Sequence, residues 1–522
     1  MIKDTAIMKA VSKIRRRAER QQSIDMLLAT FVDIGILPRL LNANNQIIYG
    51  RRGTGKTHLL KVLESSLRAD DKNVILYIDA RILGSSSQFT DQSIPIKQRC
   101  SALFQDVLSE IHNGIFTYIT GSSNPDKPFE ELSQFSTIIT ETLKKRKAGQ
   151  LIERKLKKRS LQASLDAKIS TDEAALKASI GNQENGEIEQ TVTYEVTEEN
   201  KVIFPELRDK LNSVLTKADA TLYVLFDEWS SIPLDIQPYL AEFFRRAFLP
   251  NPKIVVKIAS LEYRSNFCIK NNGSLLGFEL GADIAVSFDI DDYYVYDRNP
   301  EIITNNFIEI LFKHLASELS EGYLSSQCAV VSVEDFVTKI VTNKSVLIEL
   351  VRASEGVIRD LINIFANAFF DSRRRDRDKI DKTSVIEAAR QWFEQDKSRN
   401  LDDQLNNVLR KIIDEVIGNK KAKSFLIPRS LESNKIIQKL FDSRVLHLMK
   451  RGYADKDNPG VRYNIYTLDY GTYVDLINTT KQPQLELEPE NKHANSDDII
   501  VPFDDKRSIR RIILTEEMLA SN

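Results

Sequence analysis

Short, nearly continuous apolar runs alternate with amphipathic stretches in the first part of the chain. Strands of a parallel sheet that is buried on both faces give such runs, whereas helices place apolar residues at i, i+3 and i+4. The runs predict five strands, at residues 46–49, 73–79, 221–228, 253–259 and 282–290. Helical spacing between them, as in residues 58–67 and 98–119, predicts an α/β fold with helices covering a parallel sheet.

The pattern changes in the second half of the chain. Residues 300–398 show the spacing of several amphipathic helices, which predicts a helical domain. Residues 400–478 predict a helix, a short strand at 425–427, two helices within 431–450 and a hairpin over 453–468. This order is typical of a winged helix-turn-helix, and a slight excess of basic residues suits DNA modestly.

A chain of 522 residues is long enough for several cores. We expect a basic N-terminal helix (1–24), a sheet domain (25–298), a helical lid (299–399), a winged helix (400–478), and an acidic linker and tail (479–522). Residues 499–518 of the tail regain apolar and basic character, so they either dock on the body or recruit a partner.

A charged insertion interrupts the sheet domain at residues 120–205. Nine Lys and Arg residues lie within 144–159, and residues 170–200 are acidic and polar. Such a segment is either a solvated excursion or a basic arm for nucleic acid or a partner, and the same alternatives hold for the basic residues of 1–24. The formal net charge of −1 excludes a globally basic nucleic-acid binder, so contacts with DNA would need local patches.

Residues 50–57 lie between the first strand and the next helix, and they fit the phosphate-binding pattern G-x-x-x-x-G-K-[ST]. The glycines let backbone N–H groups turn toward phosphates at a helix N-terminus. We expect Lys56 to reach the β- and γ-phosphates of ATP and the Thr57 hydroxyl to ligate Mg²⁺. The predicted nucleotide contacts of this stretch are Gly50, Arg51, Arg52, Gly53, Thr54, Gly55, Lys56, Thr57 and His58.

The strand at residues 221–228 ends in two acids, Asp227 and Glu228. In α/β folds, ligands bind beyond the carboxyl ends of the strands. Asp227 is therefore expected to hold Mg²⁺, and Glu228 to orient and deprotonate the attacking water. At the end of the next strand, Ser260 and Glu262 are both candidates to contact the γ-phosphate or the water.

Together these features resemble AAA+ ATPases, and among them the bacterial proteins described as origin-recognition-complex-like. The resemblance covers most of residues 25–478 and is carried by 50–57, 227–230, 254–267, 356–359 and 462–471. It implies that Arg359, in the G-x-x-R of the lid, is the sensor 2 arginine that reaches the γ-phosphate. It also implies that Ser260 or Glu262 is sensor 1, and that an arginine finger acts on a neighbouring subunit, with Arg264, Arg245 and Arg246 as candidates.

The resemblance implies an ATP-hydrolysing protein that forms homo-oligomers under nucleotide control. One hypothesis is a DNA-associated ATPase, which contacts the duplex through the winged helix and the basic insertion. The alternative is a signalling or scaffold ATPase that binds a protein effector through its tail, for example in an anti-phage defence module. Three scattered cysteines, no membrane-length apolar run and no signal-peptide pattern favour the cytoplasm and no membrane partner.

Overall fold

The computed structural model describes residues 1–14, 18, 23–84, 87–122, 127–139, 204–271, 273–284, 286–295, 299–420, 422–454, 460–474 and 512–519. The basic run at 144–159, most of the insertion around it and most of the tail lie outside these residues. Arg15, Arg16, Arg17 and Arg20 of the predicted basic helix lie outside them as well.

The centre of the molecule is a five-stranded parallel sheet in the order β2-β3-β4-β1-β7. This confirms the predicted parallel sheet, with strand ends shifted by up to a few residues. Because the strands are parallel, all their carboxyl ends meet at one edge. The strands are β1 (Gln46–Tyr49), β2 (Asn73–Asp79), β3 (Thr221–Asp227), β4 (Ile254–Ser260) and β7 (Val286–Asp289).

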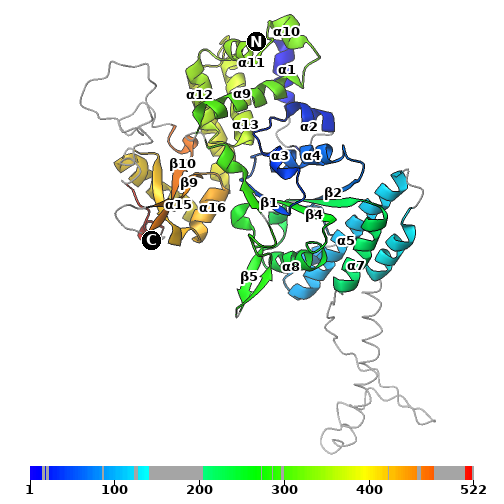
Figure 1. Ribbon diagram of the computed structural model, residues 1–522. Helices are drawn as coiled ribbons and strands as arrows, with labels where there is room; N and C mark the ends of the chain where they lie inside the picture. Colours follow the sequence, from blue (N-terminus) through cyan, green and yellow to red (C-terminus); the bar gives the residue numbers. More distant parts are fainter. Residues whose placement is uncertain are drawn as a thin grey trace, which may run out of the picture.

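Helices cover both faces of the sheet, as the apolar runs require. Alternate residues of β3 enter two separate cores: Leu222 and Val224 join one, whereas Tyr223 and Leu225 join the other. In Figure 1, α4 (Lys56–Leu67) lies above the strands, whereas α5 (Ile96–Gly121), α7 (Phe204–Lys217) and α8 (Gln237–Ala247) lie below them. A hairpin of β5 (Cys268–Asn271) and β6 (Ser274–Gly277), which the sequence pattern did not predict, packs against α8.

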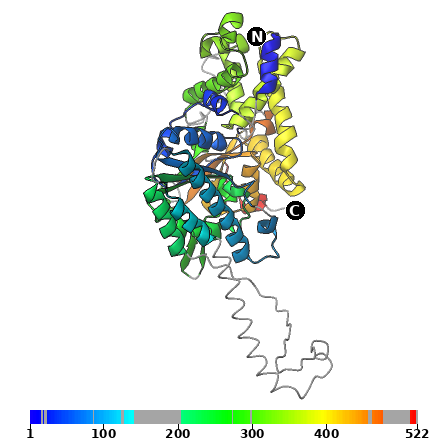
Figure 2. The ribbon, with the colours of Figure 1, turned by 90° about the vertical axis from the view of Figure 1, so that its right-hand side faces the viewer.

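The helical part forms a second layer above the sheet (Figure 1). It consists of α9 (Pro300–Ala316), α10 (Tyr323–Cys328), α11 (Val333–Ile340), α12 (Lys344–Ala353), α13 (Ile358–Arg374) and α14 (Lys382–Trp392). The N-terminal α1 (Thr5–Lys13) packs beside α9, with Ile7 and Val11 buried (Figures 1 and 2). Arg373 donates to the Ile2 carbonyl at 2.8 Å, so its end of α13 holds the N-terminus in place.

The C-terminal unit consists of α15 (Asp403–Ile413), β8 (Ser424–Pro428), α16 (Lys435–Asp442), β9 (Leu446–Ala454) and β10 (Arg462–Leu468). The expectation of two helices within 431–450 was wrong in part. The described residues contain one α-helix there, because residues 446–450 begin β9 and pair with β10. Pairing with a neighbouring strand outweighs the helical preference of a segment this short.

The end of the tail docks on this unit. The Leu426 N–H donates to the Ile512 carbonyl at 2.9 Å, and the Leu514 N–H donates to the Leu426 carbonyl at 2.8 Å. Ile512, Leu514 and Leu519 are buried. The sequence left open whether the tail docks on the body or recruits a partner, and residues 512–519 dock on the body. Among the described residues, no helix is long and apolar enough to cross a membrane.

We predict that this docking stabilises the fold. Leu514→Ala should lower the free energy of unfolding by about 2–5 kcal/mol, because a fully buried leucine is truncated. Its neighbour Ile513 is 42% exposed, so Ile513→Ala should change the value by about 0.5 kcal/mol or less. Urea unfolding of both variants measures the difference, and equal effects would contradict the docked position.

Candidate nucleotide-binding site

The loop between β1 and α4 is built around two glycines in left-handed backbone conformations. Gly53 has φ +89° and Gly55 has φ +96°, which L side chains rarely adopt. A Cβ on Gly53 would lie 2.7 Å from the Cβ of Arg359. The loop thus needs glycine at position 53 for its backbone conformation and for the approach of α13.

Lys56 opens α4 and points back into the loop. Its Nζ donates to the carbonyls of Gly50 at 2.6 Å and Arg51 at 3.0 Å. The side chain is buried, and burial lowers its pKa. A phosphate at the mouth of the loop would offer this ammonium group an anionic partner in place of neutral carbonyls.

The carboxylate of Asp227 joins three elements at the carboxyl edge of the sheet. Its Oδ2 accepts hydrogen bonds from the Thr57 hydroxyl and from the Tyr77 hydroxyl, both at 2.7 Å, and its Oδ1 accepts from the Glu228 N–H at 2.8 Å. Burial and the nearby Asp227 raise the pKa of Tyr77, which keeps the phenol a neutral donor. Lys61 lies over the Tyr77 ring, with Nζ 3.3 Å from the ring centroid.

Glu228 follows β3 with φ +55°, a left-handed backbone conformation that is uncommon for glutamate. The turn separates Glu228 from Asp227, so Glu228 lines the cavity beside the loop. Burial and the neighbouring Asp227 raise the pKa of the Glu228 carboxyl. A carboxylate with a raised pKa is a stronger base than one in water.

Arg359 reaches the site from the helical layer. It lies in the first turn of α13, and its backbone N–H donates to the Gly53 carbonyl at 3.0 Å. Its side chain lines the same cavity, which has a volume of about 330 Å³. The helical layer and the phosphate loop therefore contact each other directly.

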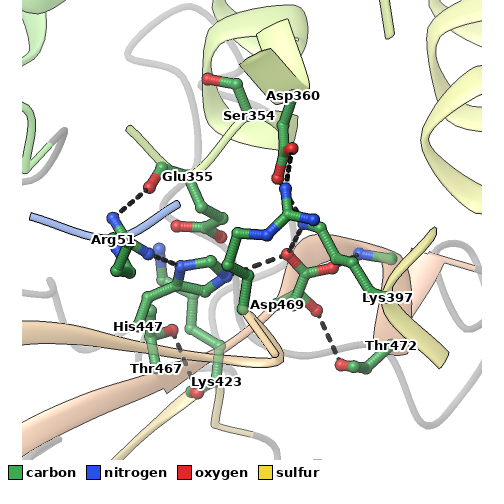
Figure 3. Close-up of polar contacts among 12 residues, drawn as sticks. Arg51, Ser354, Glu355, Asp360, Lys397, Lys423, His447, Thr467, Asp469 and Thr472 are labelled. Carbon is green, nitrogen blue, oxygen red and sulfur yellow. Dashed lines mark hydrogen bonds and ion pairs between the residues drawn. The ribbon is translucent and has the colours of Figure 1, made fainter. Parts of the chain in front are cut away.

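The cavity brings together predicted residues from three separate segments. Of the predicted set, Arg52, Gly53, Gly55, Lys56, Thr57, His58, Glu228 and Arg359 line it. Gly50, Thr54 and Asp227 do not line it. Arg51 departs from the prediction, because its backbone N–H donates to the Asp291 carboxylate at 2.9 Å and its guanidinium turns toward the C-terminal unit (Figure 3).

The two sensor 1 candidates lie beside the cavity, and neither lines it. The Ser260 hydroxyl is buried and shares a hydrogen bond with the Ser265 hydroxyl. Glu262 accepts from Arg451 of β9 at 2.5 Å. Which of the two acts as a sensor stays a prediction.

Each candidate arginine finger has a partner within the chain. Arg264 pairs with Asp442 at 2.6 Å, and the Arg264 side chain is 43% exposed. Arg245 and Arg246 of α8 both bond Glu242. The choice among the three for a role in trans stays a prediction.

Arg81 and His314 are among the cavity residues that the sequence did not predict. Arg81 follows β2 at the carboxyl edge of the sheet, so its place after a predicted strand was a usable signal. His314 comes from α9, and no local pattern links it to the loop. Burial lowers the pKa of His314 to about 4, so it contributes a neutral ring.

The oxygen atoms at the loop fit Mg²⁺ bound together with a nucleotide. The Thr57 hydroxyl and the Asp227 carboxylate converge within a hydrogen bond of each other beside the phosphate loop. Mg²⁺ prefers oxygen ligands, and with nucleotides it takes one or two from protein and the rest from phosphates and water. Among the described residues, no group of three or more His, Cys, Asp or Glu side chains forms an independent metal site.

Comparisons with known proteins agree with this arrangement. The family model described as ORC-CDC6-like matches residues 16–274. No curated protein matches the chain.

Solved structures are similar over nearly their whole length, at low identity. Cdc6p from Pyrobaculum aerophilum is 11% identical, with a TM-score of 0.32 and coverage of 90% of this chain and 97% of that chain. The ORC1 protein of Aeropyrum pernix, solved in complex with DNA, is 12% identical, with a TM-score of 0.32 and coverage of 88% of this chain and 93% of that chain. The RuvB Holliday junction branch migration motor of Thermotoga maritima is 10% identical, with a TM-score of 0.32 and coverage of 89% of this chain and 98% of that chain. TM-scores this low carry no functional argument, so the family match rests on the sequence.

We predict that Tyr77 supports the carboxylate at the loop. Tyr77→Phe keeps the ring and removes one donor to Asp227, which should lower the free energy of unfolding by about 1.5–3 kcal/mol. Tyr118→Phe removes an exposed bond to the Asp71 carbonyl and should cost about 0.5 kcal/mol or less. Equal losses in denaturant unfolding would exclude a special role for the Tyr77 hydroxyl.

Proposed function

We propose that the chain is an AAA+ protein that binds ATP with Mg²⁺, hydrolyses it and associates with DNA, because residues 16–274 match the family model described as ORC-CDC6-like. One observation carries the proposal. Lys56, Thr57, Glu228 and Arg359, from three parts of the chain, line one cavity beside Asp227.

Binding would use the loop and the residues beside it. Backbone N–H groups of the loop and the start of α4 would hold the phosphates, and Lys56 would pair with the β- and γ-phosphates. Thr57 and Asp227 would hold Mg²⁺, which when bound neutralises charge on the phosphates.

Hydrolysis would depend on positioning and charge stabilisation. Glu228 would accept a hydrogen bond from the attacking water and take its proton. Lys56 and Arg359 would stabilise the negative charge that develops on the transferred phosphoryl group. Since Arg359 belongs to the helical layer, its reach would depend on how that layer sits over the loop.

Exposed cations on the C-terminal unit support an association with DNA. Lys435 and Lys439 lie on α16, and Arg462 begins β10 of the adjacent hairpin. A helix and a hairpin at these places in the element order suit a winged helix, which is our proposal for this unit. Contacts with phosphates would dominate, so binding would be salt-dependent and largely independent of sequence.

The primary prediction concerns turnover. Lys56→Ala should lose ATP binding, whereas Glu228→Gln should bind ATP and reduce the turnover number by about 100-fold or more, the contribution of a general base. A fluorescent ATP analogue measures binding, and phosphate release measures turnover. Normal hydrolysis by Glu228→Gln would contradict the assignment of the base.

A second prediction concerns DNA. Neutralising Lys435 and Arg462 together should weaken duplex binding and reduce the slope of log affinity against log salt by about 2, one counterion for each lost phosphate contact. Lys72→Ala, an exposed cation beside the amino end of β2, is the matched control. If wild-type protein binds no duplex at low salt and duplex leaves hydrolysis unchanged, the alternative of a switch that binds a protein effector takes precedence.

A further inference from the structure

A relay of buried side chains, made of Arg51, His447, Asp469, Lys397 and Asp360, joins the phosphate loop to the C-terminal unit (Figure 3). It starts at Arg51, which is 6% exposed. The Arg51 guanidinium bonds the Asp291 carboxylate at 3.0 Å, the Glu355 carbonyl at 3.0 Å and Nδ1 of His447. A single side chain of the loop thus contacts the sheet domain, the helical layer and strand β9.

The contacts fix the protonation of His447. An arginine has no acceptor, so Nδ1 of His447 accepts from Arg51 and Nε2 carries the proton. That N–H donates to Asp469 at 2.9 Å. Burial and Arg51 lower the pKa of His447 to about 4, so the ring is neutral. It links a cation to an anion without adding charge.

The relay continues from Asp469 to the helical layer. Asp469 pairs with Lys397, in the single turn Phe393–Lys397 that follows α14, and Lys397 pairs with Asp360 at 3.1 Å. Arg444, which precedes β9, pairs with Asp360 as well. Asp360, Lys397 and Asp469 are each at most 1% exposed. Buried charges of this kind are stable only while paired, so displacing one partner is costly.

Asp360 follows Arg359 directly in the first turn of α13. The backbone N–H of Arg359 bonds Gly53, and its side chain lines the cavity. The same helical turn therefore contacts the phosphate loop on one side and the C-terminal unit on the other. A shift of the C-terminal unit has to move this turn and Arg51, or else break buried ion pairs.

We propose that the C-terminal unit forms part of the nucleotide site through this relay. Arg51 and Asp360 are positioning residues, and nucleotide binding is coupled to the position of the C-terminal unit. Coupling of this kind is reciprocal. A C-terminal unit fixed in this position raises the affinity for nucleotide, and bound nucleotide stabilises this position of the unit. This inference rests on the proposed binding of ATP or ADP in the cavity.

The test compares three variants of the full chain on strand β9. His447→Ala removes the link, His447→Gln restores an acceptor and a donor, and Lys450→Ala alters an exposed residue of the same strand. Affinity for a fluorescent ADP analogue should fall about tenfold in His447→Ala, a typical size for coupling between sites. It should recover in His447→Gln and stay unchanged in Lys450→Ala.

The second readout is the distance between spin labels at Ser109→Cys on α5 and Asn407→Cys on α15, with Cys268 and Cys328 replaced by serine. Without nucleotide, the distribution of distances between the two labels should be narrow in wild type and broad in His447→Ala. Addition of ADP should narrow the distribution in His447→Ala. Wild-type affinity together with a narrow distribution in His447→Ala would overturn the proposal.

Two further outcomes are separable. If wild-type protein binds no nucleotide, the proposed function fails, and the nucleotide-free distances still show whether the relay holds the C-terminal unit. If His447→Ala does not fold, Asp469→Asn keeps the side-chain volume and removes the central charge. The same two measurements then decide, and wild-type behaviour of Asp469→Asn in both overturns the coupling.

Discussion

The hydrogen bond from the Arg359 N–H to the Gly53 carbonyl sets how the helical layer meets the sheet domain. It requires glycine at position 53, because a Cβ there would collide with Arg359. It also places the start of α13 over the cavity, with Arg359 lining the cavity and Asp360 paired with Arg444 of the C-terminal unit. Three parts of the chain thus share one helical turn, and the shape of the cavity depends on all three.

The sheet and the central site could be predicted because their signals are local. A glycine-rich loop between an apolar strand and an amphipathic helix needs only a dozen neighbouring residues to be recognised. The acids after β3 follow from the rule that parallel strands present their carboxyl ends at one edge. Thr57 and Asp227 are 170 positions apart, yet the loop motif and that rule together predict that they meet, and they are in contact at 2.7 Å.

The relay could not be predicted, because its partners share no local pattern. Arg51 and His447 are 396 positions apart, and Arg51 stands at a position that the motif leaves unrestricted. Its place in the loop predicted a contact with the nucleotide, whereas Asp291, Glu355 and His447 are its partners. The structure of residues 446–450 was also wrongly predicted, since a five-residue segment with three apolar side chains fits a helix or a strand, and pairing with β10 makes it a strand.

The position of the C-terminal unit also bears on assembly. It contacts the loop after β4 through two ion pairs, Arg264 with Asp442 and Glu262 with Arg451. A hydrogen bond of 3.0 Å between the hydroxyls of Tyr263 and Tyr466 adds a third contact. An Arg264 that acted on a neighbouring subunit would first have to leave Asp442. Arg245 and Arg246 carry no such constraint from this unit, since both bond Glu242 within α8. Use of Arg264 in trans would therefore break one of the three contacts that hold the C-terminal unit against this loop.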